Sequence, residues 1–401
     1  MGRGRADMVS MHPSRHFIPT RAAGLERLSA VAPRLGRAYE GGRNTDSGPD
    51  RAQAASILSP YLRHRLLLET EIVALAEQRH GQAAEKYVQE VFWRTYYKGW
   101  LESHPVAWDR FLSGLAQADQ QLATASGMRR VHDDACQGHT GIECFDAWAQ
   151  ELVATNWLHN HTRMWFASIW IFTLRLPWEL GAAFFLRHLL DGDPASNTLS
   201  WRWVAGLHTA GKNYVARADN IARYTDGRFN PAGQLDEHPE SLTEAAPIPS
   251  QRTPAPPPVP TGPVWLLLHD DDLCPETLDL PGCTVQGVAG VLTHPDIVPG
   301  VAAPVQAFAA AALRDGLARG AAHFAVPNAG VLDPASVADW ARGIVVCAYA
   351  PVGPARTIIA PLGAHVVQRS FDAAAWPYAT KGYFGLRSHI PALTRSYAAG
   401  S

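Results

Sequence analysis

Residues 157–203, WLHNHTRMWFASIWIFTLRLPWELGAAFFLRHLLDGDPASNTLSWRW, decide the fold class. Apolar residues recur at three- and four-residue steps over 160–172 and again over 178–190, which predicts two helices. The run 164–174 is the most hydrophobic of the chain, but charged residues and a proline follow it at once. A run of that length is too short to cross a bilayer, so a buried helix is the better interpretation.

The same periodicity extends toward the N-terminus, where no long run alternates between apolar and polar residues. Residues 1–237 are therefore predicted to form one all-helical domain. The helices expected there, besides the two above, are 20–30, 59–79, 82–102, 106–116 and 143–155.

A change in composition marks a boundary. Residues 238–262 carry eight prolines and little apolar periodicity, which predicts an extended, semi-rigid linker. Residues 263–401 are rich in alanine, valine and glycine, and short apolar runs alternate there with helical patterns, as in a small doubly wound, Rossmann-like α/β domain. The expected strands are 264–269, 284–291, 323–326, 344–349 and 365–369, and the expected helices are 305–319, 334–342 and 354–362.

Composition narrows the class of protein. The chain has 401 residues, and its net charge of −2 gives no overall basic signature for nucleic acid. Residues 1–65 nevertheless hold eleven arginines against five acidic residues, a basic region that fits phosphates or an ordinary solvated surface equally well. The five cysteines are scattered and the N-terminus lacks an apolar signal, so we expect a cytoplasmic protein with reduced thiols and no metal site.

One helical face combines groups that suit a flat ligand with polar edges. Glu90, Trp93, Arg94 and Tyr97 are spaced at i, i+3, i+4 and i+7, so they share a stripe of the expected helix. An aromatic ring there can stack on a nucleobase while charged groups bind its edges. Taken alone, the pattern equally describes an amphipathic helix with an internal salt bridge.

A second group follows two later helices. Arg163 shares a face with Asn160, and a buried arginine needs a carboxylate partner, for which Asp191 is a candidate. Such a pair could surround the polar edge of a flavin and tune its redox states. A structural ion pair between two helices is the alternative.

Two further patterns are suggestive only in combination. Seven tryptophans fall within residues 148–203, which fits a large core or a chain of oxidisable side chains. The segment Ser56-Ile57-Leu58-Ser59-Pro60 predicts a serine-capped helix start, whose free amides can bind phosphate. Capping alone would also explain it.

In order and combination, these motifs resemble the FAD-binding domain of the DNA photolyase/cryptochrome family over residues 39–230. E-x-x-W-R at 90–94, T-G-x-x-x-x-D at 140–146, W-x-H-N-x-x-R-M at 157–164 and D-G-D at 191–193 carry the resemblance. It departs at Ala55, where threonine is usual, and in 207–220, which suggests specialised loops on the substrate side.

The resemblance implies roles for individual residues. FAD would be bound by Tyr39, Ser56, Ile57, Leu58, Ser59, Arg94, Arg163, Asp191, Gly192, Asp193 and Asn197. Catalysis would rest on Glu90, Trp93, Asn160 and Asn197, and damaged DNA would meet Arg43, Glu90, Trp93, Arg94, Tyr97, Asn160, Arg163, Met164 and Trp203. Trp201 and Trp178 match two members of the family's electron-transfer chain, whereas the distal position holds Ala135, so another residue such as Trp148 or Trp165 would have to serve.

The domain order also departs from the family. Its α/β antenna domain normally precedes the FAD domain, whereas here an α/β domain follows, and Val264–Asp270 faintly resembles the first antenna strand. A permuted antenna module is one interpretation; the sequence leaves a second chromophore and the oligomeric state open.

The function expected from the resemblance is light-driven repair of pyrimidine dimers in DNA by electron transfer from reduced FAD. The alternative is a cryptochrome-like blue-light photoreceptor, with the α/β domain as an output or partner module. A light-independent flavoprotein of biosynthesis has no specific support in the sequence.

Overall fold

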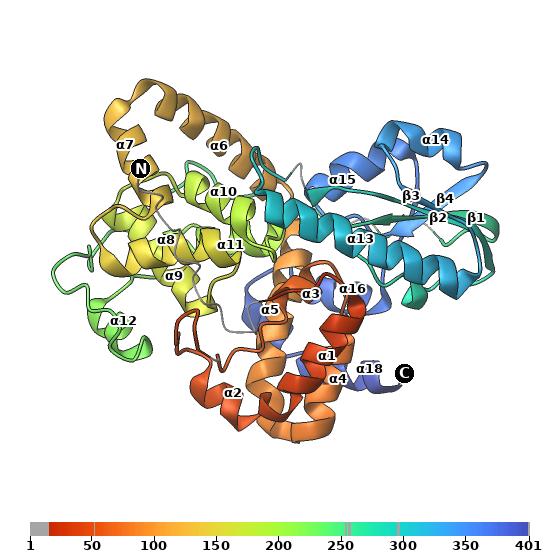
Figure 1. Ribbon diagram of the computed structural model, residues 1–401, viewed down its shortest axis with the longest axis horizontal. Helices are drawn as coiled ribbons and strands as arrows, with labels where there is room; N and C mark the ends of the chain where they lie inside the picture. The colour runs from red at the N-terminus through yellow and green to blue at the C-terminus, as the bar shows by residue number, and fades with distance from the viewer. Residues whose placement is uncertain (1–15, 52, 253–254, 256–257, 295–296, 400–401) are drawn as a thin grey trace, which may run out of the picture.

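The computed structural model describes residues 16–51, 53–252, 255, 258–294 and 297–399. Helices occupy the first half of the chain, and a sheet flanked by helices follows (Figure 1). The helices of the first half are α1 (Arg21–Val31), α2 (Arg37–Gly42), α3 (Ser59–Arg63), α4 (Glu69–His80), α5 (Glu85–Ser103), α6 (Val106–Thr124), α7 (Ser126–Gln137), α8 (Glu143–Thr155), α9 (Asn160–Ser168), α10 (Trp178–His188), α11 (Pro194–Ala205) and α12 (Ala218–Tyr224).

Local chemistry explains where several of these helices begin and end. Thr20 caps α1 by accepting a hydrogen bond from the amide of Ala23, and Asp193 caps α11 in the same way through the amide of Ser196. Helix α9 does not continue as an α-helix to residue 172 as predicted, because Ile169–Thr173 form a π-helical turn. This turn carries Trp170 into the core, where its side chain is fully buried.

The second half of the chain holds one parallel sheet of five strands in the order β3-β2-β1-β4-β5. Alternate residues of the central strand β1 face opposite layers: Leu266 and Leu268 pack in the main core with α13, and Leu267 packs with α14 and α15. The elements are β1 (Gly262–His269), β2 (Cys283–Val291), α13 (Ala303–Phe324), β3 (Asn328–Val331), α14 (Val337–Trp340), β4 (Ile344–Ala348), α15 (Pro354–Ile359) and β5 (His365–Val367).

One predicted strand is wrong. Residues 323–326 do not pair in the sheet, because α13 runs on to Phe324 and β3 begins only at Asn328. The remaining four predicted strands are confirmed within one or two residues at each end. In the linker, residues 238–252, 255 and 258–261 have no regular structure, in agreement with the prediction.

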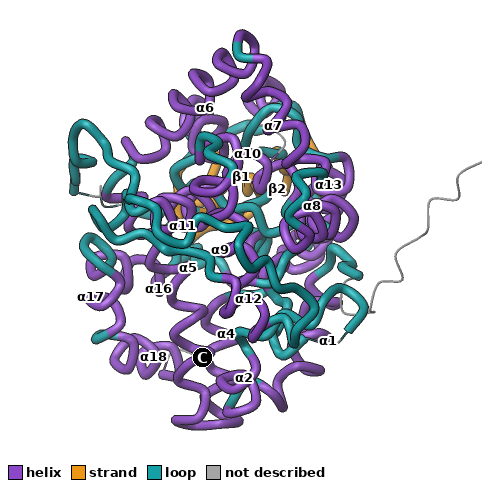
Figure 2. The backbone as a smooth tube through the Cα atoms, turned by 90° about the vertical axis from the view of Figure 1, so that its left-hand side faces the viewer, coloured by secondary structure: helices purple, strands orange, loops and turns teal. Residues whose placement is uncertain are grey.

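The last helices return to the helical part of the molecule. Helices α16 (Ser370–Ala375) and α17 (Tyr383–Arg387) contact α5, and α18 (Ile390–Ala399) contacts α4. The end view in Figure 2 shows α17 and α18 beside these helices, at some distance from the strands. The two parts therefore share an extensive interface, and most of the buried apolar side chains form one continuous core.

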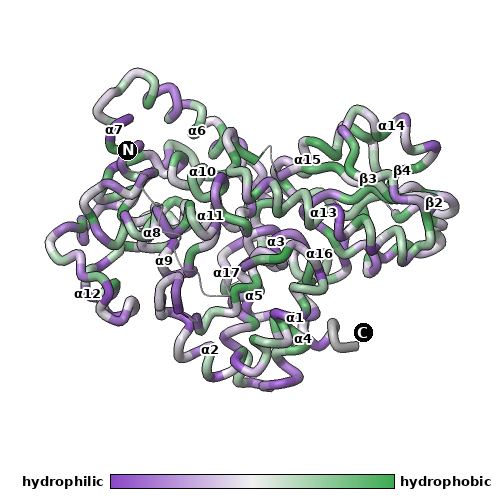
Figure 3. Tube along the Cα trace, viewed as in Figure 1, coloured by the Kyte–Doolittle hydropathy of each residue, from purple (hydrophilic) through white to green (hydrophobic). Residues whose placement is uncertain are grey.

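Hydropathy follows this arrangement. The strands and the inner face of α13 are hydrophobic, whereas α2 and α12 on the outside are mostly hydrophilic (Figure 3). No helix among the described residues is both long and apolar enough to cross a membrane. All five cysteines are free thiols.

Candidate flavin and substrate site

Helix α5 presents two of the predicted substrate residues at the edge of the helical part. The carboxylate of Glu90 lies 3.8 Å from Nε of Arg43, which extends from the end of α2. The Glu90 side chain keeps 37% of its surface exposed, and partial burial still raises the pKa of its carboxyl group. Glu90 and Arg43, predicted separately from the sequence, are thus brought together.

The ring of Trp93, one turn further along, is stacked against Tyr383 of α17. The two ring centres are 3.7 Å apart and the planes differ by 9°. The Tyr383 hydroxyl donates a hydrogen bond of 2.7 Å to the carbonyl of Gln89, which fixes the ring over the helix. Sequence reasoning missed Tyr383, because a single aromatic residue almost three hundred positions away gives no local signal.

Arg94 points into the protein. Its guanidinium donates to Glu69 at 3.3 Å and to Asp193 at 3.2 Å. Tyr97, the last residue of the predicted stripe, hydrogen-bonds the side chain of Ser200 on α11. The stripe is therefore divided between an outward pair, Glu90 and Trp93, and an inward pair, Arg94 and Tyr97, that joins α5 to α11.

The ion pair predicted between Arg163 and Asp191 is confirmed. Nη2 of Arg163 lies 2.8 Å from Oδ2 of Asp191, and Nε donates to the carbonyl of Leu158 at 3.0 Å. The pair joins α9 to the turn that follows α10. The other carboxylate oxygen of Asp191 is buried and has no hydrogen-bond partner in the described part of the chain.

Asp193 is the most strongly perturbed group of the site. Besides capping α11, its carboxylate lies 3.8 Å from Nζ of Lys98 and 3.2 Å from Arg94. Burial alone would raise the pKa of Asp193, but the cations Arg94 and Lys98 hold it well below its usual range. Burial also lowers the pKa of Lys98. The ionised form of Asp193 is therefore favoured by its two neighbouring cations.

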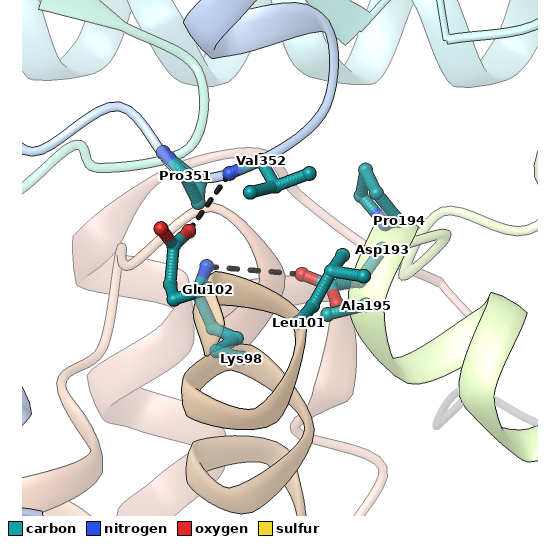
Figure 4. A pocket seen from close by; sticks show the side chains of 8 residues that line it. All are labelled: Lys98, Leu101, Glu102, Asp193, Pro194, Ala195, Pro351 and Val352. Atoms are coloured by element: carbon teal, nitrogen blue, oxygen red, sulfur yellow. Dashed lines mark hydrogen bonds and ion pairs between the residues drawn. The ribbon is translucent and has the colours of Figure 1, made fainter. Parts of the chain in front are cut away.

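A cavity of about 10 Å³ lies beside this carboxylate (Figure 4). Lys98 points toward Asp193 on one side, and Glu102 accepts a hydrogen bond of 2.8 Å from the amide of Val352 on the other. Three parts of the chain meet here: the end of α5, the start of α11 and the loop after β4.

Asn197 lies one turn into α11, and its side-chain amide donates to the carbonyl of Ala182 at 2.9 Å. Only the amide nitrogen of Asn197 takes part in this bond, and its amide oxygen does not. Ser196 Oγ and Trp201 Nε1, on the same helix, are buried without partners in the described structure. Unpartnered buried polar atoms are costly, so Ser196 Oγ, Trp201 Nε1 and Asp191 Oδ1 are each candidates to bond a polar ligand.

The predicted phosphate turn differs from its expected form. Helix α3 begins at Ser59, and its N-cap is Leu58, which makes no side-chain capping bond, so the predicted serine cap is wrong. Ile57 has φ of +53°, a left-handed conformation that is rare for a β-branched residue. Ser59 instead accepts a hydrogen bond of 3.1 Å from the indole of Trp157.

Two predicted cofactor residues on this side are joined through Tyr87. Its ring packs edge-on against Tyr39 with centres 4.9 Å apart, and the Ser56 side chain hydrogen-bonds the same tyrosine. Burial raises the pKa of Tyr39 well above its usual value. Tyr39 and the 56–59 turn therefore form one neighbourhood, as the resemblance implied.

The tryptophans expected to transfer electrons are buried in separate contacts. Trp201 packs edge-on against Trp170, with centres 6.3 Å apart, and Trp178 packs against Phe111 at 5.7 Å. Ala135, at the position of the missing distal tryptophan, is fully buried. Sequence reasoning missed Trp170, because nothing distinguishes it from the other core tryptophans.

The remaining predicted DNA residues lie at the surface or close to it. Asn160 is exposed at the start of α9, and Met164 is half-buried one turn later. Trp203 is half-buried and stacks on Tyr214, with ring centres 5.5 Å apart. The ring of Trp203 is thus supported from one side by the loop after α11.

Part of this site lies in a segment that matches a known protein family. Residues 87–238 match the FAD-binding domain of DNA photolyase. Within residues 87–238, the chain is similar to the photolyase/cryptochrome family. The family match includes most of α5 and all of α9 and α11, and therefore Glu90, Trp93, Arg163, Asp191 and Asn197. Tyr39, Arg43 and the 56–59 turn precede the matched segment, and Tyr383 follows it.

Curated proteins similar to this chain include deoxyribodipyrimidine photo-lyases. That of Streptomyces griseus is 33% identical over 203 residues, which are 46% of this chain and 41% of the relative. That of Thermus thermophilus is 34% identical over 161 residues, which are 39% of this chain and 36% of the relative. The chain thus spans about two fifths of the length of the curated relatives it matches.

Solved structures give a weaker likeness. A bacterial class III photolyase from Agrobacterium tumefaciens aligns with a TM-score of 0.42 and 23% identity, covering 51% of this chain and 44% of that one. A cryptochrome from Synechocystis sp. PCC6803 aligns with a TM-score of 0.42 and 23% identity, covering 52% and 43%.

Proposed function

We propose that the chain is a light-dependent FAD protein that repairs pyrimidine dimers in DNA. The proposal assigns residues 1–237 to a FAD-binding domain, 238–262 to a linker and 263–401 to a small Rossmann-like α/β domain. The strand order β3-β2-β1-β4-β5 supports the last assignment, because it reproduces the first five positions of the doubly wound dinucleotide-binding sheet. That domain would be an antenna-type module in a permuted position.

The observation that carries the proposal is the match of residues 87–238 to the FAD-binding domain of DNA photolyase, a segment that contains the Arg163–Asp191 pair and α11. Asp191 Oδ1 and Trp201 Nε1 are buried without partners in the described structure, as is Ser196 Oγ. When bound, FAD would supply one-electron chemistry that light can drive. Asp191 and Arg163 would orient its ring, the amide of Asn197 would lie near it, and Tyr39 with the 56–59 turn would bind its phosphates.

The outward residues of α5 suit a lesion that has been turned out of the DNA helix. A dimer must leave the base stack before its bonds become accessible. Trp93 would stack on it, and the raised pKa of Glu90 favours a protonated carboxyl that can donate a hydrogen bond to a pyrimidine carbonyl. Asn160 and Met164 would complete the pocket, and Arg43 would bind a phosphate of the strand.

The test is to illuminate the purified protein, reconstituted with FAD, with dimer-containing DNA and to measure restored thymine. Glu90→Ala and Trp93→Ala are expected to reduce repair at least about tenfold, because the first loses a hydrogen bond to the lesion and the second a stacking contact, each worth about 1–3 kcal/mol. Glu85→Gln, at an exposed position of the same helix, is the control and should repair normally. Undiminished repair in both site variants would refute the assignment.

A cryptochrome-like photoreceptor is the second candidate, and the Trp93–Tyr383 stack favours it. One face of Trp93 is already covered by the protein itself at 3.7 Å, so a base could use only the other face. In this case blue light should change the proteolysis pattern or the monomer fraction in the absence of DNA. A light-induced change without repair activity would select this function over the first.

A further inference from the structure

One buried arginine connects the turn that carries Asp191 and Asp193 to the sheet part of the molecule. Arg63, at the end of α3, is 1% exposed, and its Nε donates a hydrogen bond of 2.6 Å to the carbonyl of Gly192. Gly192 is the middle residue of the turn. The position of both aspartates therefore depends on where the Arg63 guanidinium is held.

The groups that hold this guanidinium come from the sheet part. Asp271, two residues beyond the end of β1, forms an ion pair with Nη1 of Arg63, and the Asp271 side chain is 5% exposed. Nη2 donates to Nδ1 of His294, at 3.2 Å, in the segment after β2. Burial lowers the pKa of His294 well below its usual value, so its ring is neutral and can accept this bond.

The main chain around Arg63 is fixed as well. Its carbonyl accepts from Arg94 at 3.2 Å, and the carbonyl of His64 accepts a hydrogen bond of 2.9 Å from the amide of Leu273. The arginine thus has no freedom to follow a shift of the 191–193 turn. A planar guanidinium with five donors can serve a carboxylate, a histidine and a carbonyl at the same time, which a lysine cannot.

We propose that Asp271 is a positioning residue for the flavin site: through Arg63 it holds the Gly192 carbonyl, and with it Asp191 and Asp193, in the arrangement that binds the cofactor. The sheet part then completes the binding site although none of its side chains needs to touch the flavin. This inference rests on the proposed binding of FAD and gives the α/β domain a role in it.

The neighbouring residue Asp272 is a matched control. It is 3% exposed, and it forms equally buried ion pairs with Arg369 at 2.6 Å and with Arg65 at 3.3 Å. Among the described contacts, neither of these arginines is bonded to Gly192. Asp271→Asn and Asp272→Asn therefore remove the same charge from the same interface, but only the first releases the arginine that holds the turn.

The first measurement is the dissociation constant of FAD, from quenching of flavin fluorescence, with the melting temperature of each apoprotein recorded beside it. We expect Asp271→Asn to weaken FAD binding at least about tenfold and Asp272→Asn less than about threefold, although both lower the melting temperature. Equal losses of affinity would show that the effect is only structural and would overturn the proposal.

A double variant, Arg63→Met with Asp271→Leu, covers the case in which Asp271→Asn fails to fold. Replacing both charges avoids an unpaired buried ion and commonly preserves stability, while the bond to Gly192 is still lost. FAD binding should remain weakened about tenfold in this variant. Wild-type affinity in a stably folded double variant would overturn the proposal.

Amide hydrogen exchange of the apoprotein tests the same idea without the cofactor. The peptide covering residues 189–195 should exchange faster in Asp271→Asn and in the double variant than in the wild type, and at the wild-type rate in Asp272→Asn. Exchange that is unchanged in the first two variants would refute the positioning role. If the variants show this exchange pattern but the wild-type protein binds no FAD, the proposed function is refuted instead.

Discussion

At the scale of single residues, buried histidines set the response of the protein to acid. His208 lies 2.9 Å from the hydroxyl of Tyr96, and burial, reinforced by nearby Arg202, lowers its pKa to about 4. Burial and the adjacent Arg63 likewise lower the pKa of His64 to about 4. Both rings are therefore neutral in the folded protein at pH values where the unfolded chain, with histidine pKa values near 6.5, would already be protonated.

The sign of the effect follows from proton binding. Between about pH 6.5 and 4 the unfolded chain binds more protons than the folded protein. The two histidines therefore do not reduce the free energy of unfolding above pH 6.5, and they lower it as the pH decreases through this window. Each histidine contributes about 1.4 kcal/mol for every pH unit. Urea unfolding at pH 7, 6 and 5 should show this slope, and His208→Gln should reduce it; an unchanged slope would contradict the buried neutral state.

A residue pair was predictable from the sequence where each partner belongs to a recognisable motif. The Arg163–Asp191 pair follows from the rule that a buried arginine requires a carboxylate, and it is present at 2.8 Å. The partners of Trp93 and Arg63 are Tyr383 and Asp271, which come from distant segments. No spacing rule connects such residues, because their meeting depends on how the two parts dock.

At the scale of elements, the end of α13 offers a simple test of backbone strain. Ala325 follows the helix with φ of +52° and ψ of +47°, a left-handed conformation that glycine adopts without cost. Ala325→Gly should therefore raise the free energy of unfolding by about 0.5–1 kcal/mol. Denaturant unfolding checks this. The control is Ala322→Gly, in the last turn of the same helix, which should lower stability by about the same amount.

The stack of Tyr383 on Trp93 is one of the contacts that hold helix α17 to α5, beside the ion pair of Arg387 with Glu85. Tyr383→Leu should lower the free energy of unfolding by about 1 kcal/mol and shift the fluorescence of Trp93, because the stack and the hydroxyl bond to Gln89 are lost together. Phe384→Leu is the matched control, since that ring is 75% exposed. A loss that is the same for both variants would mean that the stack contributes no specific stability.

Periodicity predicted the long helices well and their interruptions poorly. Helix α8 has the predicted bounds, whereas the predicted helix 59–79 is broken into α3 and α4 by residues 64–68. The break includes Arg65 at φ of +48°, whose side chain binds Asp372. A tertiary contact thus overrides local helix propensity at this point, as the π-helical turn at 169–173 does around Trp170.

At the scale of the whole molecule, Arg65 is the central residue of the interface between the helical and sheet parts. It binds Asp372 at 2.8 Å, Asp272 at 3.3 Å and Glu69 at 3.4 Å, all of them buried. Arg65→Met would leave the buried carboxylate of Asp372 without its ion pair, at a cost of about 3–5 kcal/mol, whereas Asp272 keeps Arg369 and Glu69 keeps Arg94.

Calorimetry should therefore show one unfolding transition in the wild type, and a lower or split transition in Arg65→Met. The control, Arg110→Met, removes a salt bridge whose arginine side chain is 33% exposed and should change stability by less than about 1 kcal/mol. A split transition already present in the wild type would contradict tight coupling of the two parts.

The fold class was readable from the sequence because composition changes sharply at the proline-rich segment 238–262. What the sequence did not reveal is that α16 and α17 pack on α5, and α18 on α4. Alanine-rich helices near the end of an α/β segment are expected to cover their own sheet. Charged residues such as Asp372 help to direct these helices to α4 and α5, but the ion pairs that they form can be identified only in the docked structure.

This return of the last helices has a consequence for biosynthesis. Arg63 and Arg65 leave the ribosome long before Asp271 and Asp372 are translated, at roughly five to twenty residues per second. During that interval the two arginines, which are buried in the folded protein, lack the aspartates that pair with them. The chain should consequently complete its fold only after synthesis has passed residue 372, and release of a truncated product short of that point should yield an aggregation-prone species.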